Sequence, residues 1–442
     1  MNQRLRRLVL FFLVACLTGC GALSRGNQAA IPTDRPSIAD LPQPHPQPVT
    51  RTSAAAQVAW LWLQTGQSSS LVAFDASGHQ AARLTAAAAA SFGPYGIWRS
   101  PDGALIFGAD AGSVTAYSAL DGHLVRTYQR SPGSIAGDAF SPDGRYLALL
   151  IFGADRLELE MINLGTGRVV GPLPVAHKPG ASMPGMIGSS SVWAATAFGP
   201  ASDRLFTLSD WGDVPQITAY GVGDDALRSL GTAALRIEPC GGPATTIKVV
   251  DAGARLAAFC HFTGAVWLID LRTLGNAAVL HSNQTNPFAA TPAYTPDGQL
   301  LYVLEGTSVQ VVDLHRQKLL GPVSISTTAL RDNPLSALAS LFVTDAEAGW
   351  VASTVPIAPD GLTLYLAGSD GILALRIPDL KVIGRLAPGL NINEVWISGD
   401  GRKLFATADD GHRLAVINAD GGPTRSISLS ATPGGFVSSE HG

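Results

Sequence analysis

Charged residues and cysteine are both scarce in this chain of 442 residues, with 14% Asp, Glu, Lys and Arg and 4 cysteines. The formal net charge is −4, and it becomes −7 without the three arginines of residues 1–19, since 27 basic residues then face 34 acidic ones. A chain without a basic excess has little with which to neutralise phosphates, so a nucleic-acid partner is not expected. The 46% hydrophobic content argues against wholesale disorder.

Catalytic motifs are also missing from the sequence. It contains no Gly-x-Ser-x-Gly elbow, no His-Glu-x-x-His, no phosphate loop and no Gly-x-Gly-x-x-Gly after a strand. The absence of Cys-x-x-Cys-His excludes covalent c-type haem. The sequence therefore predicts no catalytic residue, no metal site and no cofactor.

Residues 1–19 have the anatomy of a signal peptide, with a positive start at Arg4, Arg6 and Arg7. The apolar run over residues 8–17 is too short to cross a bilayer core of roughly 30 Å as a helix. The end of this segment, Leu-Thr-Gly-Cys at 17–20, resembles a bacterial lipobox. The resemblance implies cleavage before Cys20 and diacylglycerol on its sulfur. An ordinary signal peptide followed by a chance cysteine is the alternative.

Residues 20–54 are rich in proline and show little periodicity, which predicts an extended, partly polyproline-like tether. No other stretch approaches 18 apolar residues, so no transmembrane helix is expected. These features together predict an extracytoplasmic lipoprotein of a bacterial cell envelope, either periplasmic or at the outer surface. Its membrane contact is the lipid on Cys20.

Two cysteines remain once Cys16 leaves with the signal peptide and Cys20 carries lipid. Cys240 and Cys260 are an even pair in an oxidising compartment, which makes them disulfide candidates. A disulfide between them would stabilise the folded chain by roughly 3 kcal/mol. Two buried free thiols are the alternative.

One unit of four short strands recurs over residues 55–442. Its first turn carries the markers 101–103, 142–144, 296–298 and 359–361, all Pro-Asp-Gly, and the weaker markers 201–203, 251–253 and 399–401, at spacings of 40 to 63 residues. Pro sets φ, Asp bonds its own backbone and Gly accepts a positive φ. Short strands at this period favour the blades of a β-propeller over a β-sandwich or a doubly wound α/β fold.

The two ends of the repeated region complement each other. Residues 57–85 hold three strands and lack a first, while residues 435–442 mirror residues 96–103 and supply a candidate. Pairing them would close the ring and remove two exposed strand edges. The sequence therefore predicts an all-β, single propeller with eight four-stranded blades, or seven as the alternative, closed by the C-terminal strand.

The segment from Tyr-Thr-Pro-Asp-Gly at 294–298 through Leu-Tyr-Val at 301–303 to residues 309–314 resembles the YVTN-type repeat of WD40-like bacterial propellers. The turn and strand pattern covers residues 55–442. The resemblance implies the fold. It implies function only weakly, because propellers host binding scaffolds, lyases, lactonases and oxidoreductases alike.

Long insertions fall at about 174–192, 235–244, 282–290 and 326–350, each between an outer strand and the next inner strand. Such connections share one face, where ligands and partners are usually met. The longest contains a predicted helix whose apolar face includes Leu338 and Phe342. That face either packs on the propeller or binds a partner.

Candidate ligand-binding residues also lie at or beside the inner strands. Trp98 and Trp350 are large aromatics that either pack between blades or stack on a ligand. Asp138 and Glu394 begin two inner strands and Lys248 lies in a third, where they either hold a polar ligand or a cation or are solvated channel residues.

Two functions follow from these features. The first is a non-enzymatic binding scaffold that presents its insertion-bearing face to a protein or cell-envelope partner. The alternative is a lactonase- or lyase-like propeller enzyme with a divalent cation at the channel mouth.

Overall fold

The computed structural model describes much of the repeated region. The described stretches are 54–65, 68–84, 96–153, 156–177, 194–209, 214–223, 226–237, 245–260, 263–281, 291–305, 308–324, 355–408 and 411–437. Residues 1–53 lie outside them, so the signal peptide, the lipidation of Cys20 and the tether stay predictions.

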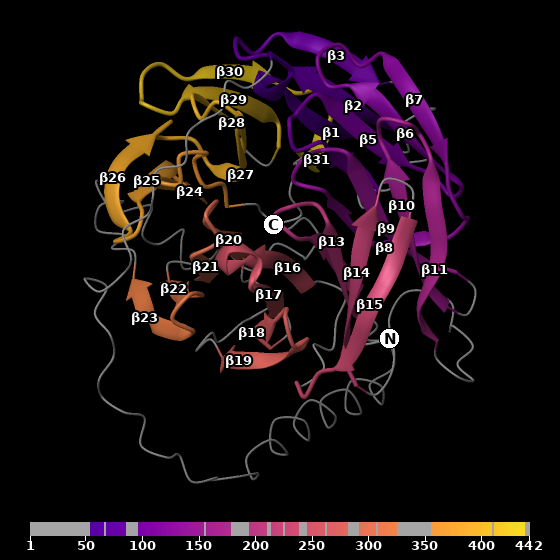
Figure 1. Ribbon diagram of the computed structural model, residues 1–442. Helices are drawn as coiled ribbons and strands as arrows, with labels where there is room; N and C mark the ends of the chain where they lie inside the picture. The colour runs from indigo at the N-terminus through magenta and orange to yellow at the C-terminus, as the bar shows by residue number, and fades with distance from the viewer. Residues whose placement is uncertain are drawn as a thin grey trace, which may run out of the picture. The chain divides into compact units, whose positions relative to one another are not determined.

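Eight antiparallel sheets follow one another along the chain and form the blades of a β-propeller (Figure 1). From the innermost strand outward, blade 1 consists of β31 (Thr432–Phe436), β1 (Ala59–Thr65), β2 (Ser68–Phe74) and β3 (Gln80–Leu84). Blade 2 consists of β4 (Ile97–Arg99), β5 (Leu105–Ala109), β6 (Ser113–Ser118) and β7 (Leu124–Gln129). Blade 3 consists of β8 (Ser134–Phe140), β9 (Tyr146–Phe152), β10 (Arg156–Asn163) and β11 (Val169–His177).

The next three blades have the same order. Blade 4 consists of β12 (Ala194–Phe198), β13 (Arg204–Ser209), β14 (Gln216–Gly223) and β15 (Ala226–Ala234). Blade 5 consists of β16 (Thr245–Val250), β17 (Arg255–Cys260), β18 (Ala265–Asp270) and β19 (Gly275–His281). Blade 6 consists of β20 (Thr291–Tyr294), β21 (Leu300–Glu305), β22 (Ser308–Asp313) and β23 (Lys318–Ser324).

The last two blades differ from each other. Blade 7 has three named strands, β24 (Thr363–Gly368), β25 (Gly371–Arg376) and β26 (Lys381–Leu386). In the described residues from 355 on, its inner position holds a single bridge between Ile357 and Leu364. Pro356 and Pro359, which cannot donate to a ladder, flank this bridge. Blade 8 consists of β27 (Ile392–Ile397), β28 (Lys403–Ala408), β29 (Arg413–Asn418) and β30 (Arg425–Ser428).

The core consists of apolar clusters between neighbouring blades. Side chains of a strand alternate between its two faces, so each blade contributes to two clusters. In β1, Trp60 and Trp62 pack against blade 2, whereas Ala59, Leu61 and Leu63 pack against blade 8. Equivalent clusters join every other pair of neighbours, so the eight sheets close into a ring.

The ring is closed by the C-terminal strand, as the sequence predicts, but β31 spans Thr432–Phe436 and so lies earlier than the predicted segment 435–442. β31 pairs antiparallel with β1, with Leu61 opposite Phe436 and Gln64 opposite Thr432. The backbone N–H of Val437 donates to the carbonyl of Trp60 at 2.9 Å. The prediction of eight blades is therefore confirmed over the alternative of seven.

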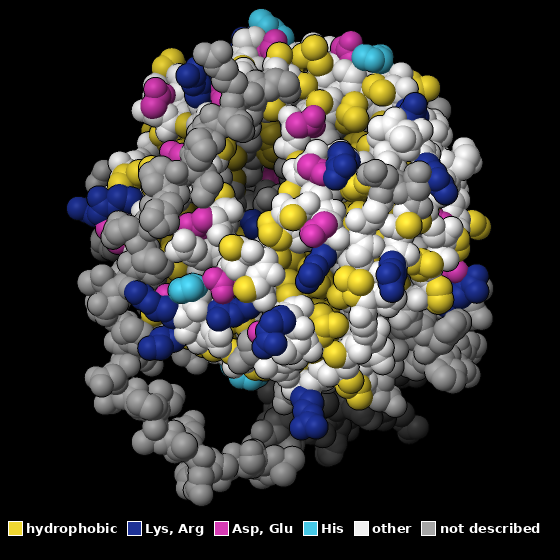
Figure 2. Space-filling view, in the orientation of Figure 1, with side chains coloured by type: hydrophobic (Ala, Val, Ile, Leu, Met, Phe, Trp, Pro, Cys, Tyr) yellow, Lys and Arg dark blue, Asp and Glu magenta, His cyan; other side chains and the backbone are white. Residues whose placement is uncertain are grey.

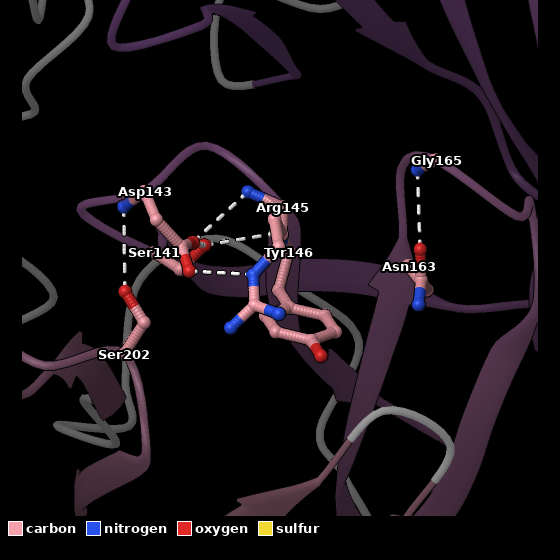
Figure 3. Close-up of polar contacts among 7 residues, drawn as sticks. All are labelled: Ser141, Asp143, Arg145, Tyr146, Asn163, Gly165 and Ser202. Atoms are coloured by element: carbon pink, nitrogen blue, oxygen red, sulfur yellow. Dashed lines mark hydrogen bonds and ion pairs between the residues drawn. The ribbon is translucent and has the colours of Figure 1, made fainter.

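The turn between the first and second strands of a blade is held by two side chains, as Figure 3 shows for blade 3. The Ser141 hydroxyl donates to Asp143 Oδ1 at 2.7 Å and accepts from the backbone N–H of Tyr146 at 2.9 Å. Asp143 Oδ1 also accepts from the N–H of Arg145 at 3.1 Å. The same bonds recur at Ser100–Asp102, Thr295–Asp297 and Ser398–Asp400.

These first turns also contact one another between blades. The N–H of Asp143 donates to Ser202 Oγ of blade 4 at 3.3 Å (Figure 3). A Cβ added at Gly401 would lie 3.1 Å from Pro359 of blade 7, and one at Gly361 would lie 3.5 Å from Pro296 of blade 6. The first turns therefore form a packed layer at one end of the ring.

Blade 1 has no such turn, because the chain does not run directly from β31 to β1. The short 3-10 helix η2 (Ala54–Gln57) takes its place. The carbonyl of Ala56 accepts from the N–H of Gly399 in blade 8 at 3.1 Å, and Gly103 of blade 2 packs against Ala56 on the other side. The chain therefore joins the ring at the end that carries the first turns.

Candidate functional site

The connections between an outer strand and the next inner strand lie at the end of the ring opposite the first turns. Consecutive strands of a blade run in opposite directions, so the connections alternate between the two ends. Those after β3, β11, β15, β19 and β23 are the long ones, and they hold residues 85–96, 178–193, 235–244, 282–290 and 325–356. The sequence predicts nearly the last four of these ranges. We call this end the connection end and the other the turn end.

Glu394 is the most unusual of the candidate residues. It lies in inner strand β27, only 8% exposed, and its Oε1 accepts a hydrogen bond from the N–H of Phe436 in β31 at 3.2 Å. Burial raises the pKa of this carboxyl to about 7, although the hydrogen bond from Phe436 lowers it in part. A carboxyl that titrates near neutrality on an inner strand can exchange a proton at physiological pH.

Lys248 and Asp138 lie on two other inner strands. Lys248 of β16 is half-buried, and its Nζ lies 5.7 Å from the ring centroid of Tyr294 in the neighbouring blade. Asp138 is half-buried in β8, which starts earlier than the sequence suggests, at Ser134. Blades 3, 5 and 8 are not neighbours, so Asp138, Lys248 and Glu394 belong to separate parts of the ring.

Trp98 of β4 packs between blades 2 and 3. It is 2% exposed and belongs to a cluster with Phe107 and Leu147. Its indole Nε1 is buried and, within the described stretches, has no hydrogen-bond partner. This arrangement leaves little ring surface for stacking on a ligand.

Several candidates lie outside the described residues. They are Cys20, Cys240, Leu338, Phe342 and Trp350. Cys260 ends β17, is fully buried and is disulfide-bonded. Because Cys240 is not described, its pairing with Cys260 stays a prediction.

Arg99 is a buried residue that the sequence analysis does not single out. It ends β4, is 2% exposed, and its Nη2 donates to the carbonyl of Ala55 in η2 at 2.5 Å. Its guanidinium carbon lies 5.0 Å from the ring centroid of Trp396 in blade 8. Burial lowers its pKa to about 10, partly offset by Asp102. Arg99 therefore joins blades 2 and 8 across the point where the chain enters the ring.

On the face drawn in Figure 2, basic and acidic side chains are interspersed with apolar ones. No group of three or more His, Cys, Asp or Glu side chains that could hold a metal ion occurs among the described residues. In the same part of the chain, no helix is long and apolar enough to cross a membrane.

Comparison with known protein families and with curated proteins finds no match. Solved structures do match. The chain is similar to the dihydro-heme d1 dehydrogenase NirN in complex with DHE, with 16% identity and a TM-score of 0.58 over 92% of this chain and 82% of that one. It is also similar to the C-terminal WD40 domain of Sif2, with 11% identity and a TM-score of 0.51 over 85% of this chain and 93% of that one. These likenesses show a WD40-like β-propeller fold.

Proposed function

We propose that this chain is a lipid-anchored, extracytoplasmic propeller that binds a protein or cell-envelope partner through its connection end, without catalysing a reaction. The observation that carries the proposal is the unequal length of the connections. The long ones, such as residues 325–356, all begin and end at the connection end, whereas residues 141–145 exemplify the short connections of the turn end. Long connections held by a rigid scaffold are common binding surfaces.

The turn end supports this proposal by contrast. Its turns bond to one another and to η2, as the contacts of Ser202 and Ala56 illustrate. Backbone groups used in this way are not available to a partner. The lipobox-like residues 17–20 support the anchor and the envelope location.

Native mass spectrometry of the protein, gently solubilised from its own membrane, tests the binding function. We expect a protein partner that is lost when residues 326–350 are replaced by a short Gly/Ser linker. Replacing residues 420–423, a turn at the opposite end, with Gly/Ser of equal length is the control and should leave the partner bound. Partner binding that survives the first change would contradict the proposal.

The anchor has its own test. The intact mass of the mature chain should correspond to a protein beginning at Cys20 with diacylglycerol and further acyl mass on that residue. An unmodified Cys20 in membrane-derived protein would remove the anchor from the proposal while leaving the binding function open to the first experiment.

One observation favours the alternative, a lactonase- or lyase-like enzyme with a divalent cation at the channel mouth. Glu394 is a buried carboxyl with a pKa of about 7, a value suited to general acid or base chemistry near neutrality. Metal analysis of the purified protein, followed by a lactone and uronate substrate panel, tests this function. Turnover that Glu394→Gln abolishes, in protein with a stoichiometric cation, would make the enzyme the better description.

A further inference from the structure

Exposed apolar side chains gather at one corner of blade 2. Leu120, Leu124 and Val125 are 48%, 60% and 48% exposed. They make up three of the seven large hydrophobic side chains that are exposed among the described residues. Single exposed aliphatic residues are normal on a protein surface, but three within six positions form a patch.

The backbone under this apolar corner is fixed. The N–H of Gly122 donates to the carbonyl of Ser118 at 2.8 Å, and the N–H of Ala119 donates to the carbonyl of Ala104 at 2.9 Å. Gly122 packs against Leu84 and Trp60 of blade 1. The three side chains are thus displayed on a rigid turn, and packing of the ring does not use them.

The apolar corner lies beside the place where the chain joins the ring. Trp60 Nε1 donates to the carbonyl of Ala119 at 2.7 Å, and Trp60 follows η2 by only a few residues. The turn at residues 119–123 joins the third and fourth strands of blade 2, so it lies at the turn end, as η2 does. In Figure 1, β7 of blade 2 runs beside β3 of blade 1.

We propose that Leu120, Leu124 and Val125 rest on the lipid surface to which Cys20 anchors the chain, an inference that rests on the lipid anchor of the proposed function. The 33 residues between Cys20 and Ala54 span at most about 115 Å. The tether meets the ring at Ala54, so the surfaces of the ring next to Ala54 encounter the bilayer more often than the others. Aliphatic side chains placed there lose their contact with water by entering the lipid interface.

The charges of the apolar corner indicate how it would bind. Residues 118–126 carry Asp121, His123 and Arg126 as their ionisable side chains. Asp121 and His123 are paired at 2.7 Å, and Arg126 donates to the carbonyl of Gly165 in blade 3 at 3.0 Å. Residues 118–126 therefore hold no cluster of unpaired cations, so contact of these residues with lipid depends on apolar burial and should differ little between zwitterionic and anionic membranes. This orientation would also point the connection end away from the bilayer, toward a partner.

Fluorescence quenching by brominated lipids tests the contact. The lipid-anchored full chain is reconstituted into phosphatidylcholine vesicles with and without bromine on the acyl chains, and Leu124→Trp is compared with Ile383→Trp. Ile383 is 54% exposed in β26 of blade 7, which makes it a matched control. We expect the added tryptophan at position 124 to be quenched at least threefold more than that at 383, equally in 0.1 M and 1 M NaCl.

Each other outcome overturns the inference in a recognisable way. Equal quenching at the two positions, or quenching at 124 that 1 M NaCl removes, would contradict an apolar contact by this corner. An unquenched Leu124→Trp variant that still floats with the vesicles would show that the anchor holds and the corner stays in water. Failure of the wild-type chain to float would instead remove the anchor itself. As a second readout, replacing Leu120 and Val125 by Ser in the Leu124→Trp variant should abolish the difference in quenching between positions 124 and 383, whereas adding Leu230→Ser to Leu124→Trp should not.

Discussion

Glu394 of blade 8 accepts a hydrogen bond from the backbone N–H of Phe436, 3.2 Å away, in the strand that closes blade 1. The ring closure therefore includes a buried ionisable group. Its pKa is raised by burial to about 7 from an ordinary value of 4.5. Because the protonated form is favoured in the folded chain, the stability that this group contributes is fully present below pH 4.5 and is lost as the pH rises through 7.

Glu394→Gln should make the stability of the protein less dependent on pH. Gln keeps an oxygen that can accept from Phe436 and cannot ionise, so the variant should be more stable than the wild type at pH 8, by on the order of 2–3 kcal/mol at about 1.4 kcal/mol per pKa unit. The two proteins should be nearly equal at pH 4.5. Urea unfolding between pH 4.5 and 8.5 measures this difference, and a constant difference across the range would contradict the assignment.

Ala358→Ser should stabilise blade 7. Ala358 occupies the position of Ser141 and Ser398 in the other turns, and Asp360 already accepts from the N–H of Leu362 at 2.9 Å. The added hydroxyl can complete the pair of bonds seen elsewhere, for a gain of about 0.5–1.5 kcal/mol. Urea unfolding measures this gain in the free energy of unfolding. The gain should be smaller in an Asp360→Ala background, which lacks the acceptor for the added hydroxyl, and the reverse change, Ser141→Ala, should lower stability by about 1–2 kcal/mol.

Gly434→Ala should weaken the closure of the ring. A Cβ at Gly434 would come closer to Trp62 Cδ1 than real Cβ atoms do, so β31 or Trp62 must shift. Such overpacking costs about 1–3 kcal/mol. Gly112→Ala is the control, because no atom lies within 4 Å of its added Cβ, and it should stay within about 0.5 kcal/mol of the wild type. Equal urea midpoints for the two variants would argue against strain at β31.

Arg99 and Trp396 should be energetically coupled across blade 1. Arg99→Gln removes both the bond to Ala55 and the contact with Trp396, and should cost about 2–4 kcal/mol, as removal of a buried charged partner does. A double-mutant cycle with Trp396→Leu should return a coupling of about 0.5–2 kcal/mol. A coupling of zero would mean that the two side chains are neighbours without an energetic link.

Much of the fold can be predicted from the sequence because its signals are local. The Pro-Asp-Gly turns mark one end of four of the eight blades, and the continuous apolar run over residues 59–63 indicates a strand buried on both faces. The closing strand follows because residues 435–442 copy a local pattern. Blade 7 differs from this prediction, since its described residues show a single bridge where the repeat predicts an inner strand.

The contacts at the closure could not be predicted in the same way. The pair Arg99–Ala55, the pair Arg99–Trp396 and the bond between Glu394 and Phe436 join residues far apart in sequence. They form only when eight blades fit one ring, so no short pattern records them. The hydroxyl that holds the first turns of blades 2, 3, 6 and 8 precedes the turn aspartate by two residues, but the sequence alone does not show that it also accepts a bond from the N–H five residues onward, as Ser141 does from Tyr146.

The pairing of β31 with β1 sets the order of events during synthesis. The strands β1, β2 and β3 of blade 1 are made before those of the other blades, but their inner neighbour β31 is made after all of them. Until residue 436 is available, the edge of β1 that carries Leu61 has no partner strand, and an unpaired edge is a template for aggregation. A growing chain must therefore keep this edge from other chains while the other seven blades are made.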